Sequence, residues 1–350
     1  MALHGARSPQ WKFMLLDRQD RPLRELEGVD GGGGEVVAQS RLGGSASLII
    51  DERGQAIDWQ SHRVQAIYDP GIPGEDPWPM GTYLFTSPEE AHGTPGVTYD
   101  VGLLTKMTAV DEDSTEARFS VAPGEPVIPI VRSLIESAGE HRISVTGSDA
   151  VLSSGITWDA GISKLTVINE LLTAVGYWSL WCDGGGVFRV EPYLDPASRQ
   201  PAYTFRHGER AVHFPEWGRS QDLSSVPNRF IAVGQGDEEN EPLVGVALNE
   251  NPDSPYSYQA RGRWITATEE GVEGDSQAIF DQYAARRLRD LMNPVARMSA
   301  THAALPLAAN DLVEFIPEDG IRRLATVQRM SFDFTYDTDF KVEWREVIAA

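Results

Sequence analysis

The stretch SKLTVINELLTAVGYWSLWCDGGGVFRVEPY, from Ser163 to Tyr193, carries the clearest fold signal in the chain. Its first half predicts a helix, because apolar residues recur at helical spacing between Ser163, a suitable N-cap, and Gly176, which suits a left-handed stop. Its second half is rich in aromatic and β-branched residues and turns on residues 183–186, which predicts a hairpin. The stretch is therefore a helix that leads into a hairpin, and it carries no catalytic signature.

The residues before this stretch extend it into a small α+β domain, expected over residues 119–198. A second helix is predicted over residues 126–139, because prolines occupy its first turn and a glycine its end. A strand is predicted over residues 142–146. Two helices with interleaved strands are enough for a compact domain of ordinary size.

The first 118 residues are predicted to form a β-rich domain. Turn residues separate short apolar runs, which is typical of a sandwich or small barrel. Gly31, Gly32, Gly33 and Gly34 are expected to lie in a loop, because four glycines lose much conformational freedom in a fixed backbone. The runs predicted to be strands are residues 11–16, 36–40, 45–50, 62–68, 82–86 and 97–104.

A second β-rich domain is predicted from residues 199–242 and 294–350, with residues 243–293 as an insertion. Its last strand should place Phe340, Val342 and Trp344 on one face. Within the insertion, residues 243–275 are expected to be irregular, and Ser276 to cap a third helix. The inward residues of that helix would be Phe280, Tyr283, Ala284, Leu288 and Leu291. No fixed-period repeat is visible, and the two β-rich ends are similar only in kind.

The predicted fold class is therefore α+β and β-dominated, with two β-barrel or sandwich-like domains flanking a small α+β domain. The N-terminus has no apolar segment typical of a signal peptide, and no run approaches the roughly 18 apolar residues of a membrane span. We therefore expect neither in this chain.

The chain is acidic, with 52 Asp and Glu residues against 30 Lys and Arg residues and a formal net charge of −22. Specific binding of nucleic acid is disfavoured, because it depends on neutralising phosphates with Lys and Arg. The simplest interpretation of this charge is solubility. A sharper one is a surface along which DNA passes without adhering.

The residues with chemical potential do not assemble into a motif. The single cysteine, Cys182, is expected to be a buried small residue and not a nucleophile. The sequence Gly234-Gln235-Gly236 follows a predicted strand, but the acidic residues after it would repel a pyrophosphate. None of the seven histidines shows the i, i+4 pairing of a helical zinc site, although a metal site assembled across the fold remains an alternative.

Acidic and aromatic residues invite two further hypotheses. A glycosidase carboxylate pair is not excluded by composition, yet Glu89-Glu90 and Asp111-Glu112-Asp113 are more typical of solvated loops. Nine tryptophans raise the idea of carbohydrate binding, but core packing explains those on predicted strands. We therefore predict no catalytic, cofactor-binding or metal-binding residues, and no enzyme.

Three stretches give the chain a resemblance to a known family. Residues 164–193 are similar to a helix ending in Gly-Tyr that leads into an aromatic hairpin finishing Val-Glu-Pro-Tyr. Residues 227–234 look like an Asn-Arg-hydrophobic strand, and residues 283–288 and 305–313 like a helix, a short apolar turn and Gly-Asp-x-Val. Asn310 stands where glycine is commoner. Together these stretches resemble the hub proteins at the distal end of phage tails, including baseplate hubs and tail-associated minor tail proteins.

The resemblance implies a structural role at the tail tip of a virion. In that family, three subunits form a ring of six similar β-rich units, which adapts a sixfold tail tube to a threefold tip and lets DNA pass. It implies a homotrimer, with the distal tail protein, the tail tube or tape measure and the tip or fibre proteins as partners. The alternatives are a tail-tip cell-wall hydrolase, a glycan- or receptor-binding module, and a receptor contact made by residues 243–275.

Overall fold

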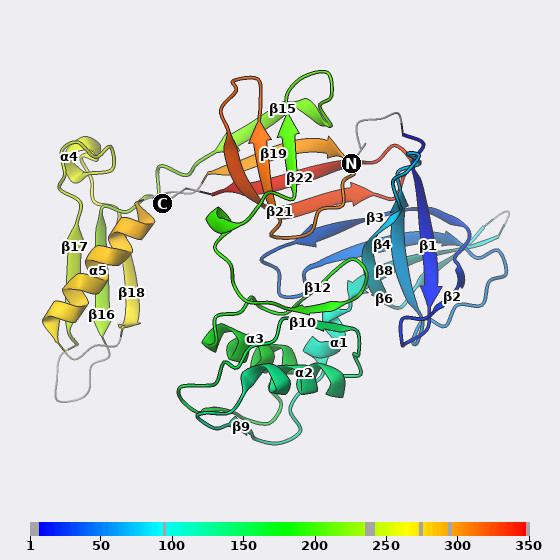
Figure 1. The fold of residues 1–350 in the computed structure, drawn as a ribbon, viewed down its shortest axis with the longest axis horizontal. Coiled ribbons are helices and arrows are strands. Elements are labelled where there is room, and N and C mark those ends of the chain that lie inside the picture. The colour runs from blue at the N-terminus through cyan, green and yellow to red at the C-terminus, as the bar shows by residue number, and fades with distance from the viewer. Residues whose placement is uncertain (1–6, 94–95, 235–241, 273–275, 293–295, 348–350) are drawn as a thin grey trace. The chain divides into compact units, whose positions relative to one another are not determined.

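The computed structural model describes residues 7–93, 96–234, 242–272, 276–292 and 296–347. The chain divides into two compact units, of which the first comprises residues 1–218 and 299–350 and the second residues 219–298. Strands dominate the larger unit, and the smaller unit combines a three-stranded sheet with α4 (Tyr258–Arg261) and α5 (Gln277–Leu291) (Figure 1). The β-dominated α+β class predicted from the sequence is confirmed.

The first β-rich segment belongs to the larger unit. Its core strands alternate buried apolar residues with exposed ones, as in β4, where Leu48 and Ile50 are buried and Ser47 and Ile49 are exposed. Strands occur at each predicted run, but of residues 36–40 only Val36 and Val37 belong to a strand, the end of β3, and residues 38–40 form a turn. All the pairings in this segment are antiparallel. The strands are β1 (Gln10–Leu16), β2 (Pro22–Glu25), β3 (Val29–Val37), β4 (Gly44–Asp51), β5 (Arg63–Asp69), β6 (Trp78–Phe85), β7 (Glu89–His92) and β8 (Val97–Thr105).

The second β-rich segment completes the larger unit. The meander predicted near the C-terminus is confirmed, and Phe340, Val342 and Trp344 share a buried face of its last strand. The elements of this segment are η1 (Pro196–Ser198), β14 (Tyr203–Arg206), β15 (His213–Ser220), β19 (Arg297–Ala303), β20 (Leu312–Ile316), β21 (Arg323–Asp333) and β22 (Asp339–Glu346).

One sheet runs through both β-rich segments. Its strand order among the described residues is β15-β19-β22-β21-β3-β4-β8-β6-β5-β1-β2, with β7, β14 and β20 attached to the side of this path. The two segments meet where β21 pairs antiparallel with β3. The predicted pair of separate β domains is thus joined edge to edge through main-chain hydrogen bonds.

The glycine run Gly31–Gly34 lies in β3, so the loop predicted there is wrong. A Cβ atom on Gly33 would lie 2.8 Å from the carbonyl oxygen of Phe332 on β21, and one on Gly34 would lie 3.0 Å from the Phe332 ring. Glycine is therefore required by the close approach of neighbouring strands. The ladders with β4 and β21 hold the backbone that the composition alone would leave free.

The two β-rich segments repeat one strand order. In the first, the spatial order is β3-β4-β8-β6-β5, and in the second it is β15-β19-β22-β21-β20. The matched strands also follow one another in the same order along the chain, as β3, β4, β5, β6, β8 and β15, β19, β20, β21, β22. The structure therefore contains an internal repeat of topology that the sequence does not reveal.

The α+β part lies between these segments in the chain and packs its helices on a small sheet (Figure 1). The helix predicted from the opening stretch is present as α3, and Gly176 after it has φ +73°. Ser163 stands at the N-cap position, but its hydroxyl donates to Asp111 and caps no backbone N–H. The elements are α1 (Met107–Glu112), β9 (Phe119–Val121), α2 (Val127–Ser137), β10 (Ile143–Val145), β11 (Ile156–Trp158), α3 (Lys164–Ala174), β12 (Trp181–Cys182) and β13 (Phe188–Val190).

The second compact unit begins at Arg219, not at residue 243 as the sequence predicts. Its three-stranded sheet takes β16 from the predicted second β-rich domain, and the irregular segment expected over residues 243–275 contains two strands of this sheet. One helix, α5, packs on the sheet through Phe280, Ala284 and Leu288, as predicted. The elements are β16 (Arg229–Gly234), β17 (Val244–Leu248), α4 (Tyr258–Arg261), β18 (Thr266–Val272) and α5 (Gln277–Leu291).

Candidate functional site on the polar face of the continuous sheet

The structure gathers no set of side chains suited to catalysis or metal binding. Within the described ranges, no group of three or more His, Cys, Asp or Glu residues could hold a metal ion. Cys182 is half-buried, and desolvation of its sulfur raises the pKa of the thiol to about 12, which makes it a poor nucleophile. Residues 235–236 of the glycine motif lie outside the described residues. No helix in the described part of the chain is long and apolar enough to cross a membrane.

A more distinctive feature is the polar face of the continuous sheet. Buried and exposed residues alternate on β22, on β4 and on the second half of β21, so one face of each strand packs into the core and the other bears polar side chains. Serines and a threonine stand between charged residues on this face, at Ser45, Ser47, Ser299, Thr301 and Ser331. Its acidic residues include Glu35, Asp51, Glu89, Asp100, Glu216, Asp333, Asp339 and Glu343, and its basic residues include Arg297, Arg329, Lys341 and Arg345.

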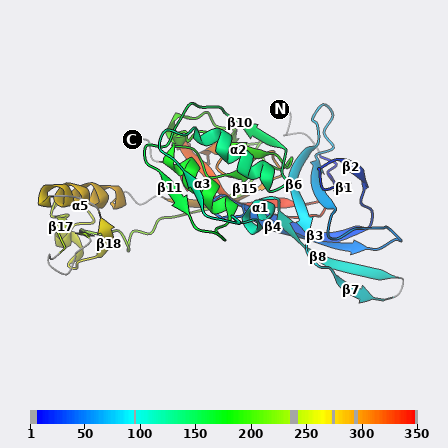
Figure 2. The same ribbon diagram turned by 90° about the horizontal axis from the view of Figure 1, so that it is seen from below.

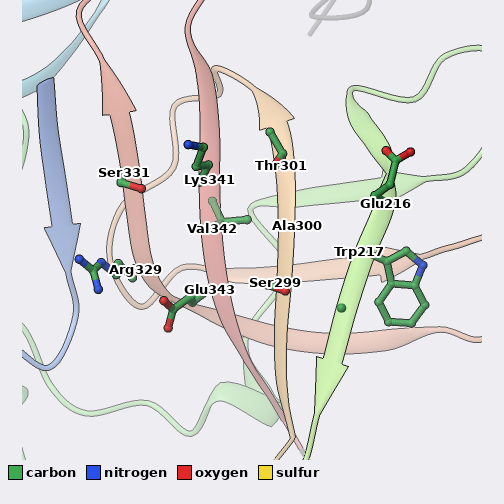
Figure 3. A pocket seen from close by; sticks show the side chains of 11 residues that line it. Glu216, Trp217, Ser299, Ala300, Thr301, Arg329, Ser331, Lys341, Val342 and Glu343 are labelled. Carbon is green, nitrogen blue, oxygen red and sulfur yellow. The ribbon is translucent and has the colours of Figure 1, made fainter.

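A groove of about 490 Å³ lies on this face across β15, β19, β22 and β21 (Figure 3). Acidic and basic side chains both line it. Arg329 is held by Glu35 of β3, with 2.6 Å between Nη2 and Oε2, which spans the junction of the two segments. The remaining charged lining residues are Glu216, Lys341 and Glu343.

Trp217 anchors the β15 edge of the groove. Its ring packs edge-on against buried Phe315 with 5.2 Å between centroids, and the guanidinium of Arg323 lies 5.1 Å from its ring centroid. Its indole N–H donates to Glu318 over 3.3 Å. These contacts hold the edge strand in place. They also account for Trp217 as a packed side chain, without a carbohydrate ligand.

A buried charge cluster fixes the α+β part against the first β-rich segment. Asp20, Arg63 and Lys106 come from the β-rich segment and its end, and Glu140 comes from the loop after α2. Lys106 Nζ lies 2.5 Å from Asp20 Oδ2 and 2.8 Å from Glu140 Oε2, while Arg63 contacts the same two carboxylates at 2.7 and 2.6 Å. Two anions and two cations are thereby balanced out of contact with water.

The glycine turn of the opening stretch docks beside this cluster. Lys106 Nζ donates to the carbonyl oxygen of Gly186 over 2.8 Å, and the Thr82 hydroxyl donates to that of Gly184 over 3.1 Å. A Cβ atom on Gly184 would lie 2.2 Å from the carbonyl oxygen of Pro79. Gly184 is therefore required by the close approach to β6, and Gly186, with φ +81°, by the left-handed turn beside Thr82.

Two buried histidines lie in the aromatic core of the second segment. His302 on β19 packs against Phe205, Phe340 and Trp344, and its Nδ1 lies 2.7 Å from the carbonyl oxygen of Ala303. Burial lowers the pKa of His302 to about 4. Burial also lowers the pKa of His213, on β15. Both imidazoles are therefore neutral near pH 7 and serve as core side chains.

The acidic residues considered as a glycosidase pair lie in unrelated parts of the structure. Glu89-Glu90, expected in a loop, form the exposed strand β7, and Asp111 binds Arg41 and the hydroxyl of Ser163. The sequence analysis does not predict the polar face. Alternation within single strands was visible in the sequence, but the joining of two segments into one face depends on the β3–β21 pairing.

Comparisons with known proteins place this fold. No family model matches the sequence, and no curated protein sequence matches it. A tail protein from Neisseria meningitidis MC58 superposes with a TM-score of 0.65 at 13% identity, over 96% of this chain and 97% of that one. The chain has the fold of phage tail proteins.

Two further structures agree with this assignment of the fold. The 43 kDa tail protein of prophage MuSo2 from Shewanella oneidensis gives a TM-score of 0.62 at 13% identity, over 95% of this chain and 98% of that chain. An E. coli component of the type VI secretion system, described as similar to the T4 tail proteins gp27 and gp5, gives 0.54 at 10% identity over 96% and 77%. The resemblance drawn from the sequence is confirmed for the fold.

Proposed function

We propose that this chain is a structural hub protein of a phage tail tip, assembling as a homotrimer. The observation that carries the proposal is the repeated strand order of its two β-rich segments, joined edge to edge in one sheet. Three copies supply six such segments, which is what a pseudo-sixfold ring on a sixfold tube requires. The shared fold of tail proteins supports a role in the tail.

The polar face is proposed to line the channel through which DNA passes. Acidic residues outnumber basic ones on it, and small hydroxyl side chains lie between them. Such a surface offers few cations to phosphates, so DNA gains little by releasing counterions and moves past without being held. The distal tail protein, tube or tape measure and tip or fibre proteins are the proposed partners. No catalytic role is assigned.

The assembly is tested on the purified full chain by native mass spectrometry and by electron microscopy. An inert trimer with a ring of six similar densities around a central opening supports the proposal. A stable monomer that degrades peptidoglycan or a polysaccharide contradicts it and favours a hydrolase.

The channel assignment is tested by reversing charges on the face. The double variant Glu216→Lys and Glu343→Lys should increase the retention of the assembled protein on double-stranded DNA. A matched double variant, Glu112→Lys and Glu209→Lys, changes net charge equally at exposed sites in α1 and in the loop between β14 and β15. Equal retention by the two variants would show that net charge alone matters and would remove the support for the channel face.

A further inference from the structure

Four strands of the continuous sheet have one neighbour each among the described residues, namely β2, β7, β14 and β15, and the repeat relates β7 and β15 to strands that are paired. β7 pairs with β8 alone, and β15 pairs with β19 alone. All four residues of β7 are exposed, and Figure 2 shows β7 and β8 projecting together as a hairpin at one end of the sheet. The unpaired N–H and C=O groups of such an edge are a template for a strand of another chain.

The chain itself shows how an edge of this kind is filled. β3 is the outer strand of the β3–β4 hairpin, and it pairs antiparallel with the second half of β21, from Val37 opposite Arg329 to Gly33 opposite Asp333. In the repeat, β15 takes the place of β3 as the outer strand beside β19. The first segment therefore has its outer edge paired, and the second has the equivalent edge open.

β7 takes the place of the second half of β21. The first half of β21 pairs with β20, whereas the second half extends past it to β3. In the first segment, β6 pairs with β5 and with the end of β8, and β7 continues the same line along the beginning of β8. The second half of β21 pairs with β3 on its outer side, whereas β7, in the equivalent place, has no strand on its outer side among the described residues.

We propose that β7 of one copy pairs antiparallel with β15 of a neighbouring copy, repeating between subunits the junction that β21 and β3 form within the chain. The inference rests on the proposed trimer and names its interface. Each copy offers one edge of each kind, so the contact is heterologous and closes a ring. Six junctions then alternate around it, three within chains and three between them.

The backbone of β15 limits what this pairing can use. The carbonyl oxygen of Val212 accepts from the N–H of Ala303, so alternation turns Phe214 and Glu216 toward β19 and turns Pro215 and Trp217 outward. Pro215 has no N–H and offers only its carbonyl oxygen. The pairing therefore depends on that carbonyl and on both backbone groups of Trp217.

The side chains of β7 are placed by the same reasoning. The carbonyl oxygen of Val97 accepts from Glu52, so Thr98 and Asp100 face β7, and their partners Ala91 and Glu89 face β8. Glu89 and Ala91 would then form non-hydrogen-bonded pairs with Phe214 and Glu216, with Cα atoms about 4.5 Å apart, within reach of a disulfide. Glu90 and His92 carry the outward N–H groups.

Cysteine cross-linking of the full chain tests the pairing. Four double variants combine Glu89→Cys or Ala91→Cys with Phe214→Cys or Glu216→Cys, under mild oxidation. Native Cys182 stays out of the reaction because its pKa of about 12 leaves almost no thiolate. At least one pair should give covalent dimers and trimers, and reduction of the disulfides with dithiothreitol should return them to monomers on a denaturing gel. The control, Glu90→Cys with Glu216→Cys, places the thiols on opposite faces and should give none.

A second variant keeps the hairpin while weakening the contact. Glu90→Pro removes one outward N–H and no bond to β8, so the melting temperature should hold while each junction weakens about five- to tenfold, from one lost hydrogen bond. If the protein forms a ring trimer, none of the four cysteine pairs cross-links and Glu90→Pro does not weaken assembly, the proposed interface is wrong. That result would not contradict the hub role. A chain that stays monomeric and uncross-linked at every concentration overturns both.

Discussion

Removal of the Lys106 ammonium is the sharpest test of how the α+β part is held. The substitution Lys106→Met keeps the length and most of the volume of the side chain but removes its charge. Asp20 and Glu140, whose carboxylates it separates, would remain buried with Arg63 as their only cation among the described residues. The carbonyl oxygen of Gly186 would also lose its donor.

The magnitude follows from these contacts. Removing one partner of a buried ion pair lowers the free energy of unfolding by about 3–5 kcal/mol, because the opposing charge stays desolvated. We expect about 4 kcal/mol for Lys106→Met. Adding Glu140→Gln leaves one anion and one cation, Asp20 and Arg63, and should restore about half of the loss. Arg132→Met, which breaks an exposed pair with Glu136, should change it by less than about 0.5 kcal/mol.

Urea unfolding followed by tryptophan fluorescence measures these differences, with hydrogen exchange to locate them. Exchange should accelerate in β12 and β13 and at the Gly184–Gly186 turn, since the turn loses its anchor. A loss below about 1 kcal/mol for Lys106→Met, or a double variant no more stable than the single one, would refute the reasoning that charge balance holds the two parts together.

Three further predictions concern other parts of the chain. Gly33→Ala should destabilise the larger unit by about 2 kcal/mol through its clash with Phe332, whereas Gly147→Ala, which meets nothing within 4 Å, should be neutral in the same urea titration. Phe280→Ala should lower only the unfolding transition of the smaller unit, by about 3–5 kcal/mol, as resolved by exchange on α5. Lowering the pH from 7 to 5 should reduce stability by about 2 kcal/mol through His302, and His302→Phe should flatten that slope.

The sign of the pH effect is set by the lowered pKa. The unfolded imidazole titrates near 6.5 and the folded one near 4, so between these values the unfolded state binds more protons. Stability is complete above pH 6.5 and falls until the pH reaches about 4. Substitution of the exposed His92 should leave the profile unchanged. A flat profile in the native chain would show that His302 is not the buried neutral group seen here.

Local signals in the sequence predicted most elements but not how they combine. The α3 helix ends at a left-handed Gly176, and β22 alternates as predicted, because these features depend on neighbours a few residues apart. The sequence predicts a loop at the glycines of β3, because the strand that requires them, β21, lies some 300 residues away in the chain. The prediction that residues 243–275 are irregular is wrong for the same reason, because both strands in this segment pair with β16, which lies outside it.

The candidate site follows the same division. Alternation indicated which side chains of β22 face water, yet nothing local indicated that Lys341 and Glu343 share a groove with Glu216 and Arg329. The charge cluster was equally hidden, because Asp20, Arg63, Lys106 and Glu140 carry no common motif. Charged residues scattered in sequence become recognisable as a set only when the strands that bear them are paired.

The internal repeat gives these observations a common physical basis. A ring built from two like segments per chain needs every junction to have the same geometry, while only half of the junctions are held by chain connectivity. The β3–β21 junction is the connected kind, and its glycines and the Arg329–Glu35 ion pair fit one particular partner. The open junction, with Pro215 on one side and a short acidic strand on the other, has fewer groups to pair. Such an interface would be weaker than the internal one, so assembly of the purified chain into trimers should depend on protein concentration.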